Sequence, residues 1–319
     1  MKTEPGFFEI PRVSPDTPFE DLDRDYFRPE MPVIIEGAGR DWPALKKWSL
    51  AYLQEKLSDE PSLKHIAYFL VLDSDALADD AAYPEFIERF NDPARIFPYP
   101  SNARIWINSK NNVSAWHYDT GVVNNFNTQI IGRKEWLLVS PQTPPDCYPF
   151  SNIVVLSDDG RILQDTIYTR CITRPGDMLY LPPLWYHAVK ALDESNINLM
   201  WVFTKRRADV ISPALARDEF RYRAHRYLLS HRFPWVRHAY ARLRPRLPGW
   251  LKVVWHYDQL IETGIPRTRW GGVRWLLREL AMLGRTVATI PRLRRQSRRA
   301  EMAPRLSGAT PDRDGAGYG

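Results

Sequence analysis

Apolar positions between residues 100 and 204 fall in short runs bounded by turn residues, a pattern typical of buried strands. A run at residues 105–108 opens this strand-rich region, and a second lies at residues 136–139, where Ser140 and Pro141 end it. Residues 144–159 form a loop-rich crossing with a turn signal at its end. We therefore expect a core built mainly of strands.

The chain before this core has a mixed pattern, which predicts α/β elements. Residues 32–37 read as a short buried strand. Ser49 stands where an N-cap is expected, and the helix it begins would run to Leu57.

The last third of the chain changes to helical spacing. Residues 212–230 read as a helix with Ser212 as cap and Pro213 in its first turn. Between residues 273 and 287 apolar side chains recur at helical spacing with arginines among them. Residues 304–319 are polar and contain glycine, which favours a disordered tail.

These changes divide the chain into three parts. We expect one domain over residues 1–204, with its core at about 100–204, a basic helical region over residues 205–303 and the tail over residues 304–319. At 319 residues the chain can bury a large core.

Composition indicates a chain that folds without disulfides. Cys147 and Cys171 are the two cysteines, too few for a disulfide framework. The first residues have no apolar signal core, and no apolar run reaches the length of a spanning helix. We expect a cytoplasmic protein, with a peripheral membrane position as the alternative.

Charge is distributed unevenly along the chain, which has 44 Lys and Arg, 38 Asp and Glu, and a formal net charge of +6. Most acids precede Lys205, and arginine dominates after it. This asymmetry favours an anionic partner such as nucleic acid, an acidic peptide or a membrane surface. The alternative is that these arginine-rich helices form an outer layer of the protein or a homodimer surface, because the aliphatic part of an arginine side chain covers apolar surface while its guanidinium group stays solvated.

Three residues carry the candidate chemistry. His117 and Asp119 occur in Trp-His-Tyr-Asp, and His187 ends a segment that starts with Pro-Gly-Asp at residues 175–177. On a strand, residues i and i+2 point to the same face. His117 and Asp119 can therefore aim at one point, and His187 from a distant strand completes two histidines and one carboxylate. That ligand set leaves open positions on a non-haem Fe(II) ion.

Two other interpretations of these residues need weighing. A bare His-x-Asp also arises by chance, but the Pro-Gly-Asp turn and the second histidine favour a metal. Zinc accepts the same residue types. A structural zinc site would want a fourth ligand, and neither cysteine lies beside the three residues in the sequence.

A second Trp-His-Tyr-Asp occurs at residues 255–258, within a segment of helical spacing. On a helix His256 and Asp258 would point about 200° apart and could not share a metal. We therefore assign no metal to this copy.

With these motifs, residues 106–203 resemble the JmjC-type cupin hydroxylases, the group that includes the asparaginyl hydroxylase factor-inhibiting HIF. The resemblance rests on residues 114–119, residues 125–134 and residues 175–187, and the entry region at residues 28–49 is also similar. It implies an α+β protein whose core is a double-stranded β-helix, the cupin or jelly-roll barrel. It also implies Fe(II), 2-oxoglutarate and O2 as cofactor and co-substrates, with His117, Asp119 and His187 as iron ligands.

The resemblance further assigns residues to the co-substrate. Lys134, in a Gly-x-Lys step, corresponds to the lysine that pairs with the distal carboxylate of 2-oxoglutarate. Ser114 stands where a hydroxyl helps to hold the same carboxylate, and Asn125 matches an amide near the metal-bound end. Each is also compatible with an ordinary role: a solvated surface lysine, or a turn serine or asparagine.

One strand departs from the family pattern. Met200 and Val202 stand where relatives often have an asparagine and a tryptophan, which removes one polar contact to the co-substrate.

The resemblance implies a dioxygenase that hydroxylates a side chain of a peptide or protein. Demethylation of an N-methyl group on protein or nucleic acid is the alternative by the same chemistry. A non-catalytic cupin that binds through its basic C-terminal region is the alternative from a different class.

Overall fold

The computed structural model describes residues 8–56, 70–71, 75–81, 84–90, 96–97, 103–120, 123–147, 152–156, 162, 169–205, 234–243, 246 and 277. Its helices are α1 (Phe19–Leu22), continued by a π-helical turn at Asp23–Phe27, α2 (Ala44–Lys47), α3 (Leu50–Lys56), a 3-10 helix at Asp75–Asp80, α4 (Glu85–Phe90) and α6 (Pro234–Leu243). Its strands are β1 (Phe8–Glu9), β2 (Arg12–Val13), β3 (Val33–Ile35), β4 (Leu70–Val71), β5 (Ile96–Phe97), β6 (Ala103–Ser109), β7 (Val113–Tyr118), β8 (Val123–Ile131), β9 (Lys134–Val139), β10 (Thr169–Thr173), β11 (Met178–Leu181), β12 (Tyr186–Ala191) and β13 (Ser195–Lys205).

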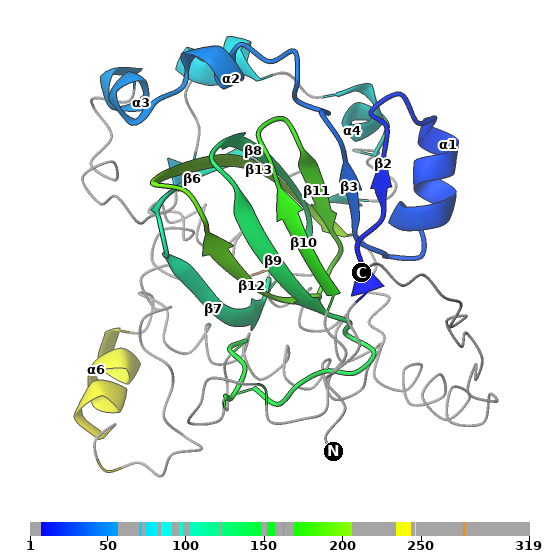
Figure 1. The fold of residues 1–319 in the computed structure, drawn as a ribbon. Coiled ribbons are helices and arrows are strands. Elements are labelled where there is room, and N and C mark those ends of the chain that lie inside the picture. Colours follow the sequence, from blue (N-terminus) through cyan, green and yellow to red (C-terminus); the bar gives the residue numbers. More distant parts are fainter. Residues whose placement is uncertain are drawn as a thin grey trace, which may run out of the picture.

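These strands form two sheets that face each other (Figure 1). The smaller sheet has the order β1-β10-β9-β12-β7. The larger has the order β2-β3-β11-β8-β13-β6-β4, with β5 also paired to β13. From β6 to β13 the strands alternate between the two sheets, except that β9 and β10 are neighbours in the smaller sheet. The predicted double-stranded β-helix of an α+β protein is thereby confirmed.

Apolar side chains fill the space between the two sheets. Trp136 and Leu138 of β9 form one buried cluster with Ile34, Leu179 and Leu181 from the larger sheet. Since side chains alternate along a strand, these residues define an inner face on each sheet. The candidate site lies on the same inner faces.

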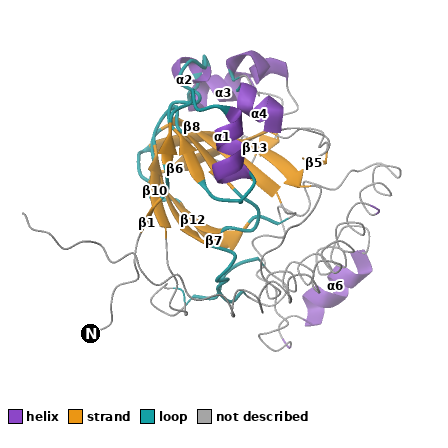
Figure 2. Ribbon diagram, turned by 90° about the vertical axis from the view of Figure 1, so that its right-hand side faces the viewer, coloured by secondary structure: helices purple, strands orange, loops and turns teal. Residues whose placement is uncertain are grey.

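The larger sheet buries its other face beneath helices, which Figure 2 shows gathered over β8 and β13. Phe126 of β8 is fully buried there and meets Phe90 of α4 edge-on, at a centroid distance of 5.1 Å. Leu53 of α3 and Ala44 of α2 belong to the same core cluster. This layer fixes β8 and β13, which contribute the inner face beside the site.

Several expectations for individual elements are confirmed. Residues 33–35 form the buried strand β3, and Trp136 to Val139 lie in β9. The Oγ of Ser49 accepts a hydrogen bond from the backbone N–H of Tyr52 at 3.0 Å, so Ser49 caps α3 as predicted.

Other expectations fall outside the described residues: the helix at residues 212–230, the second Trp-His-Tyr-Asp at residues 255–258, and the tail at residues 304–319. Of residues 273–287, Leu277 alone is described. In the described part of the chain, no helix is both long and apolar enough to cross a membrane. The three-part division of the chain stays a prediction.

Candidate metal centre

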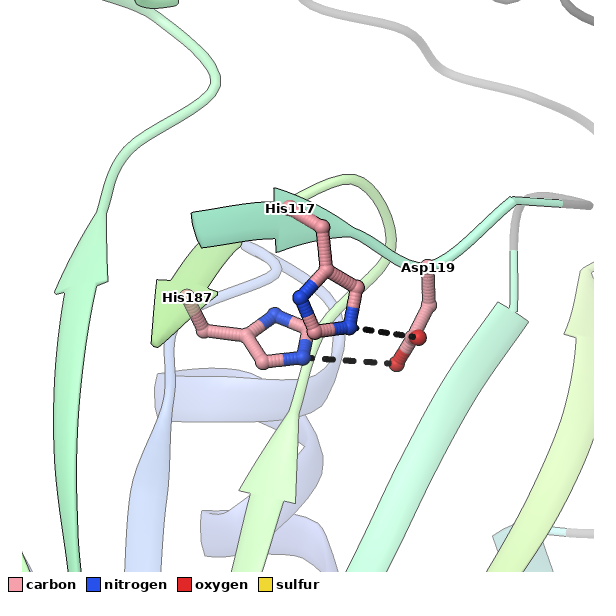
Figure 3. Close-up of side chains that lie close together, drawn as sticks. All are labelled: His117, Asp119 and His187. Carbon is pink, nitrogen blue, oxygen red and sulfur yellow. Dashed lines mark ion pairs between the residues drawn. The ribbon is translucent and has the colours of Figure 1, made fainter. Parts of the chain in front are cut away.

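His117, Asp119 and His187 point toward one another (Figure 3). His117 of β7 and His187 of β12 are directly opposite each other in an antiparallel pair, and Asp119 follows the end of β7. The Nε2 of His117 lies 3.8 Å from Oδ1 of Asp119, and the Nε2 of His187 lies 3.9 Å from its Oδ2. One potential ligand atom from each residue falls within 4.8 Å of the others.

The second ring nitrogen of each histidine is held by backbone. The Nδ1 of His117 lies 2.6 Å from the carbonyl oxygen of Ala115, and the Nδ1 of His187 lies 3.0 Å from that of Trp185. A carbonyl oxygen only accepts, so in each neutral ring Nδ1 carries the hydrogen. Each Nε2 atom then carries the lone pair of its ring. Both lone pairs face the space beside the Asp119 carboxylate, where a metal ion would be bound.

Electrostatics favour the neutral form of His117. Burial, with a contribution from neighbouring His187, lowers the pKa of His117 to about 4. The imidazole is therefore unprotonated at neutral pH and needs to lose no proton to bind a cation. Two imidazoles and a carboxylate suit Fe(II), and three protein ligands leave coordination positions of that ion for other groups. The three residues fit the expected metal.

Asn125 supports the carboxylate of this group. It lies on the inner face of β8, is almost fully buried, and its Nδ2 donates a hydrogen bond to Oδ2 of Asp119. The Oδ1 of Asn125 is buried with no hydrogen-bond partner among the described residues. A buried acceptor of this kind beside the metal position is suited to contact an additional bound group. The contact of Asn125 with the co-substrate stays a prediction.

Lys134 enters the barrel from the start of β9. It is only 4% exposed, so it is not a solvated surface lysine. Its Nζ donates to Oδ1 of Asn108 on β6 at 2.7 Å and to Oδ1 of Asn198 on β13. Burial lowers the pKa of Lys134 to about 7. This cation without a carboxylate partner in the described structure fits the distal carboxylate of 2-oxoglutarate.

Gly132, the glycine of the Gly-x-Lys step, forms the turn that leads into Lys134 at the start of β9. Gly132 has φ +71°, and a Cβ there would lie 2.3 Å from the carbonyl oxygen of Ser195. Only glycine fits this left-handed, crowded turn between β8 and β9.

Ser114 reaches the inner face through an irregularity in β7. Val189 of β12 lies opposite Ser114, whereas His187 lies opposite His117, so β7 has one extra residue between the two pairs. Residues directly opposite each other share a face of the sheet, and Val189 packs against the inner cluster. Ser114 thus lies on the same face as His117, although alternation alone would separate them. Its contact with the co-substrate stays a prediction.

Met200 and Val202, where β13 departs from the family pattern, have apolar surroundings in the structure. Met200 and Val202 form a small buried cluster with Val123, against which Trp106 also packs. Asn198, which precedes them on the same face of β13, brings an amide to Lys134 instead. The sequence interpretation overlooked Asn198 and Asn108. The polar positions Asn198 and Asn108 in otherwise apolar strands were the available signal.

The Pro-Gly-Asp turn before β11 is a structural element. Oδ2 of Asp177 accepts from the backbone N–H of Arg174 at 3.1 Å and pairs with Arg12 of β2, also at 3.1 Å. Gly176 has φ +91°, which allows the turn. Asp177 therefore anchors the N-terminal segment and is not a metal ligand.

Comparisons with known proteins agree with this geometry. Residues 67–209 match the model of the cupin-like domain, and this range includes all six predicted site residues. The chain is 26% identical over 217 residues to lysine-specific demethylase 8 of Xenopus tropicalis, covering 55% of this chain and 49% of that protein. It is 24% identical over 248 residues to tRNA wybutosine-synthesizing protein 5 of Danio rerio, covering 60% and 75%.

A third relative is the bifunctional arginine demethylase and lysyl-hydroxylase psr-1 of Caenorhabditis briggsae, 23% identical over 263 residues, with 62% of this chain and 65% of that protein covered. The chain spans about half the length of several curated relatives it matches.

A double-stranded β-helix that carries two histidines and a carboxylate is typical of cupin metalloproteins. The match of residues 67–209 to the cupin-like domain agrees with this arrangement. JmjC cupin proteins use Fe(II), 2-oxoglutarate and O2. The narrower likeness to the factor-inhibiting-HIF group stays a prediction.

Proposed function

We propose that this protein is an Fe(II)- and 2-oxoglutarate-dependent dioxygenase. The observation that carries the proposal is the convergence of His117, Asp119 and His187, with both histidine Nδ1 atoms held by backbone carbonyls and both Nε2 atoms directed toward the Asp119 carboxylate. A degenerate cupin would have no need to keep this set intact. The intact set favours an enzyme over the non-catalytic binding module.

The residues divide into two groups by the species they would hold. His117, Asp119 and His187 would bind Fe(II), and Lys134 would bind the distal carboxylate of 2-oxoglutarate, with Ser114 beside it. Asn125 would orient the Asp119 carboxylate and offer its Oδ1 to a bound group. Bound Fe(II) would supply the oxidative decarboxylation of 2-oxoglutarate by O2 to succinate and CO2, with one oxygen atom of O2 going to succinate and the other into a substrate C–H bond.

The protein contributes orientation and a dry environment. The backbone bonds of His117 and His187 fix both rings, so little rearrangement is needed when a metal binds. Buried apolar side chains of both sheets line the inner faces on which the metal position and Lys134 lie, and a charge-assisted hydrogen bond is stronger in such surroundings than in water.

We propose hydroxylation of a side chain on a peptide or protein as the reaction. The relative named as both an arginine demethylase and a lysyl-hydroxylase supports a protein substrate. Demethylation is the second candidate, because hydroxylation of an N-methyl group releases it as formaldehyde, and the relative named lysine-specific demethylase 8 favours it. The relative named for tRNA wybutosine synthesis extends that candidate to nucleic acid.

An anaerobic titration tests the chemistry without a known substrate. Fe(II) and 2-oxoglutarate together should produce a metal-to-ligand charge-transfer band that neither produces alone. Absence of the band with folded protein would leave the binding module as the better interpretation. Mass spectrometry of substrate peptides then separates the reactions, since hydroxylation adds one oxygen and demethylation removes one methylene.

We also propose an anionic partner or a homodimer contact for the basic region at residues 205–303. Its support is the excess of arginine after Lys205.

A further inference from the structure

Lys134 joins the two sheets through amide side chains. It stands on β9 of the smaller sheet, and the two acceptors that its Nζ has among the described residues belong to the larger sheet: Asn108 on β6 and Asn198 on β13. An ammonium group has three N–H donors. Two are used by these amide oxygens, which leaves one for a further acceptor.

The amide groups of Asn108 and Asn198 cannot neutralise the positive charge of the Lys134 ammonium group. An amide oxygen carries a partial charge, and a buried cation with no anionic partner is costly. The lowered pKa of Lys134, caused by burial, reflects that cost. A bound carboxylate would supply the missing negative charge.

Both amides are themselves fixed in orientation. The Nδ2 of Asn108 donates to Oδ1 of Asn112 at 3.0 Å, and the Nδ2 of Asn198 donates to Oδ1 of Asn127 at 3.4 Å. Because each NH2 group is committed to another asparagine, each Oδ1 is turned toward Lys134. The result is a hydrogen-bonded row that runs from Asn112 through Lys134 to Asn127.

We propose that Asn108 and Asn198 are positioning residues that hold the Lys134 ammonium with its remaining proton available to the distal carboxylate of the co-substrate, and thereby set the preference for a 2-oxo diacid over a 2-oxo monoacid. The inference rests on the proposed function. Neutral amides suit this task because they orient the ammonium without competing for its charge. A carboxylate at either position would pair with Lys134 and take the place of the ligand.

The experiment compares two ligands that differ only in the distal group. Affinities of anaerobic, Fe(II)-loaded protein are measured by calorimetry for 2-oxoglutarate and for 2-oxopentanoate, which has the same carbon chain without the second carboxylate. The parent should prefer 2-oxoglutarate. Asn198→Asp and Asn108→Asp should each reduce that preference by about tenfold, the scale of one hydrogen bond to a charged group.

Asn124→Asp is the matched control, because Asn124 is a buried asparagine of β8 whose amide bonds Tyr180 and the Phe203 carbonyl rather than Lys134. It should lower the melting temperature and leave the ratio of the two affinities unchanged. A purely structural role for Asn108 and Asn198 would likewise change both affinities equally.

Two results would overturn the inference. A parent that prefers 2-oxoglutarate, with the same preference in both folded Asp variants, overturns it and leaves the proposed function standing. A folded parent that binds neither ligand overturns the proposed function and the inference together.

Discussion

His117 and His187 face each other across neighbouring antiparallel strands, with ring centroids 4.2 Å apart and planes tilted by 52°. The pairing of β7 with β12 sets this separation, because the two residues are direct partners in the ladder. A metal ion at this point would be bound by rings that the sheet has already placed.

The first prediction concerns the ligands. His117→Ala, Asp119→Ala and His187→Ala should each remove most Fe(II) binding while the chain stays folded, because each removes one of the converging donors. Equilibrium dialysis measures the binding and circular dichroism the fold. His256→Ala, in the second Trp-His-Tyr-Asp, is the control and should bind iron like the parent. Iron binding by all three ligand variants would disprove the site.

The second prediction concerns the co-substrate. Lys134→Ala should weaken 2-oxoglutarate binding by about 1.5–3 kcal/mol, the strength of a hydrogen bond to a charged group. Iron affinity should stay nearly unchanged, because Lys134 is not among the converging metal donors. Calorimetry with each ligand separates the two effects, and unchanged 2-oxoglutarate affinity would exclude the role given to Lys134.

The third prediction is a pH dependence. The pKa of Lys134 without co-substrate is lowered to about 7 by burial, and a bound carboxylate favours the protonated form, so binding should raise that pKa. Affinity for 2-oxoglutarate should thus be constant below pH 7 and fall above it, by up to about tenfold per pH unit.

Calorimetry of iron-loaded protein across this pH range measures the slope. 2-Oxopentanoate is the control and should show no comparable loss, since it has no distal carboxylate for Lys134. Equal slopes for the two ligands would assign the titration to another group.

The fourth prediction concerns the turn before Lys134. Gly132→Ala should destabilise the fold by about 1–3 kcal/mol, because it combines a left-handed backbone with a close approach of Cβ to the Ser195 carbonyl. Denaturant unfolding measures the loss. Arg133→Ala is the neighbouring control: it removes an exposed ion pair with Asp193 and should change stability little. Equal stability of the two variants would contradict the strain assigned to Gly132.

The fifth prediction concerns the basic region at residues 205–303. If it recruits an anionic partner, full-length protein should bind acidic liposomes, RNA or DNA at low salt and be released as salt is added, because charges are screened over about 10 Å at 0.1 M salt. Co-sedimentation and filter binding test this. Failure with all three ligands would favour the structural or homodimer role.

The sequence was sufficient for features that depend on neighbours along the chain. The spacing of His117 and Asp119 placed both on one face, because alternation is a property of a single strand. The cap at Ser49 was predictable for the same reason, since a cap involves residues of one helical turn.

Only the tertiary structure determined which distant side chains meet. Asn108, Asn198 and Lys134 lie on three strands in two sheets, and the pairing order that brings them together appears in no local pattern. The face of Ser114 depended on an irregular register that reverses the simple alternation. Local periodicity fixes the side of a strand on which a residue lies, whereas strand order and register, set by packing of the whole core, decide what that residue contacts.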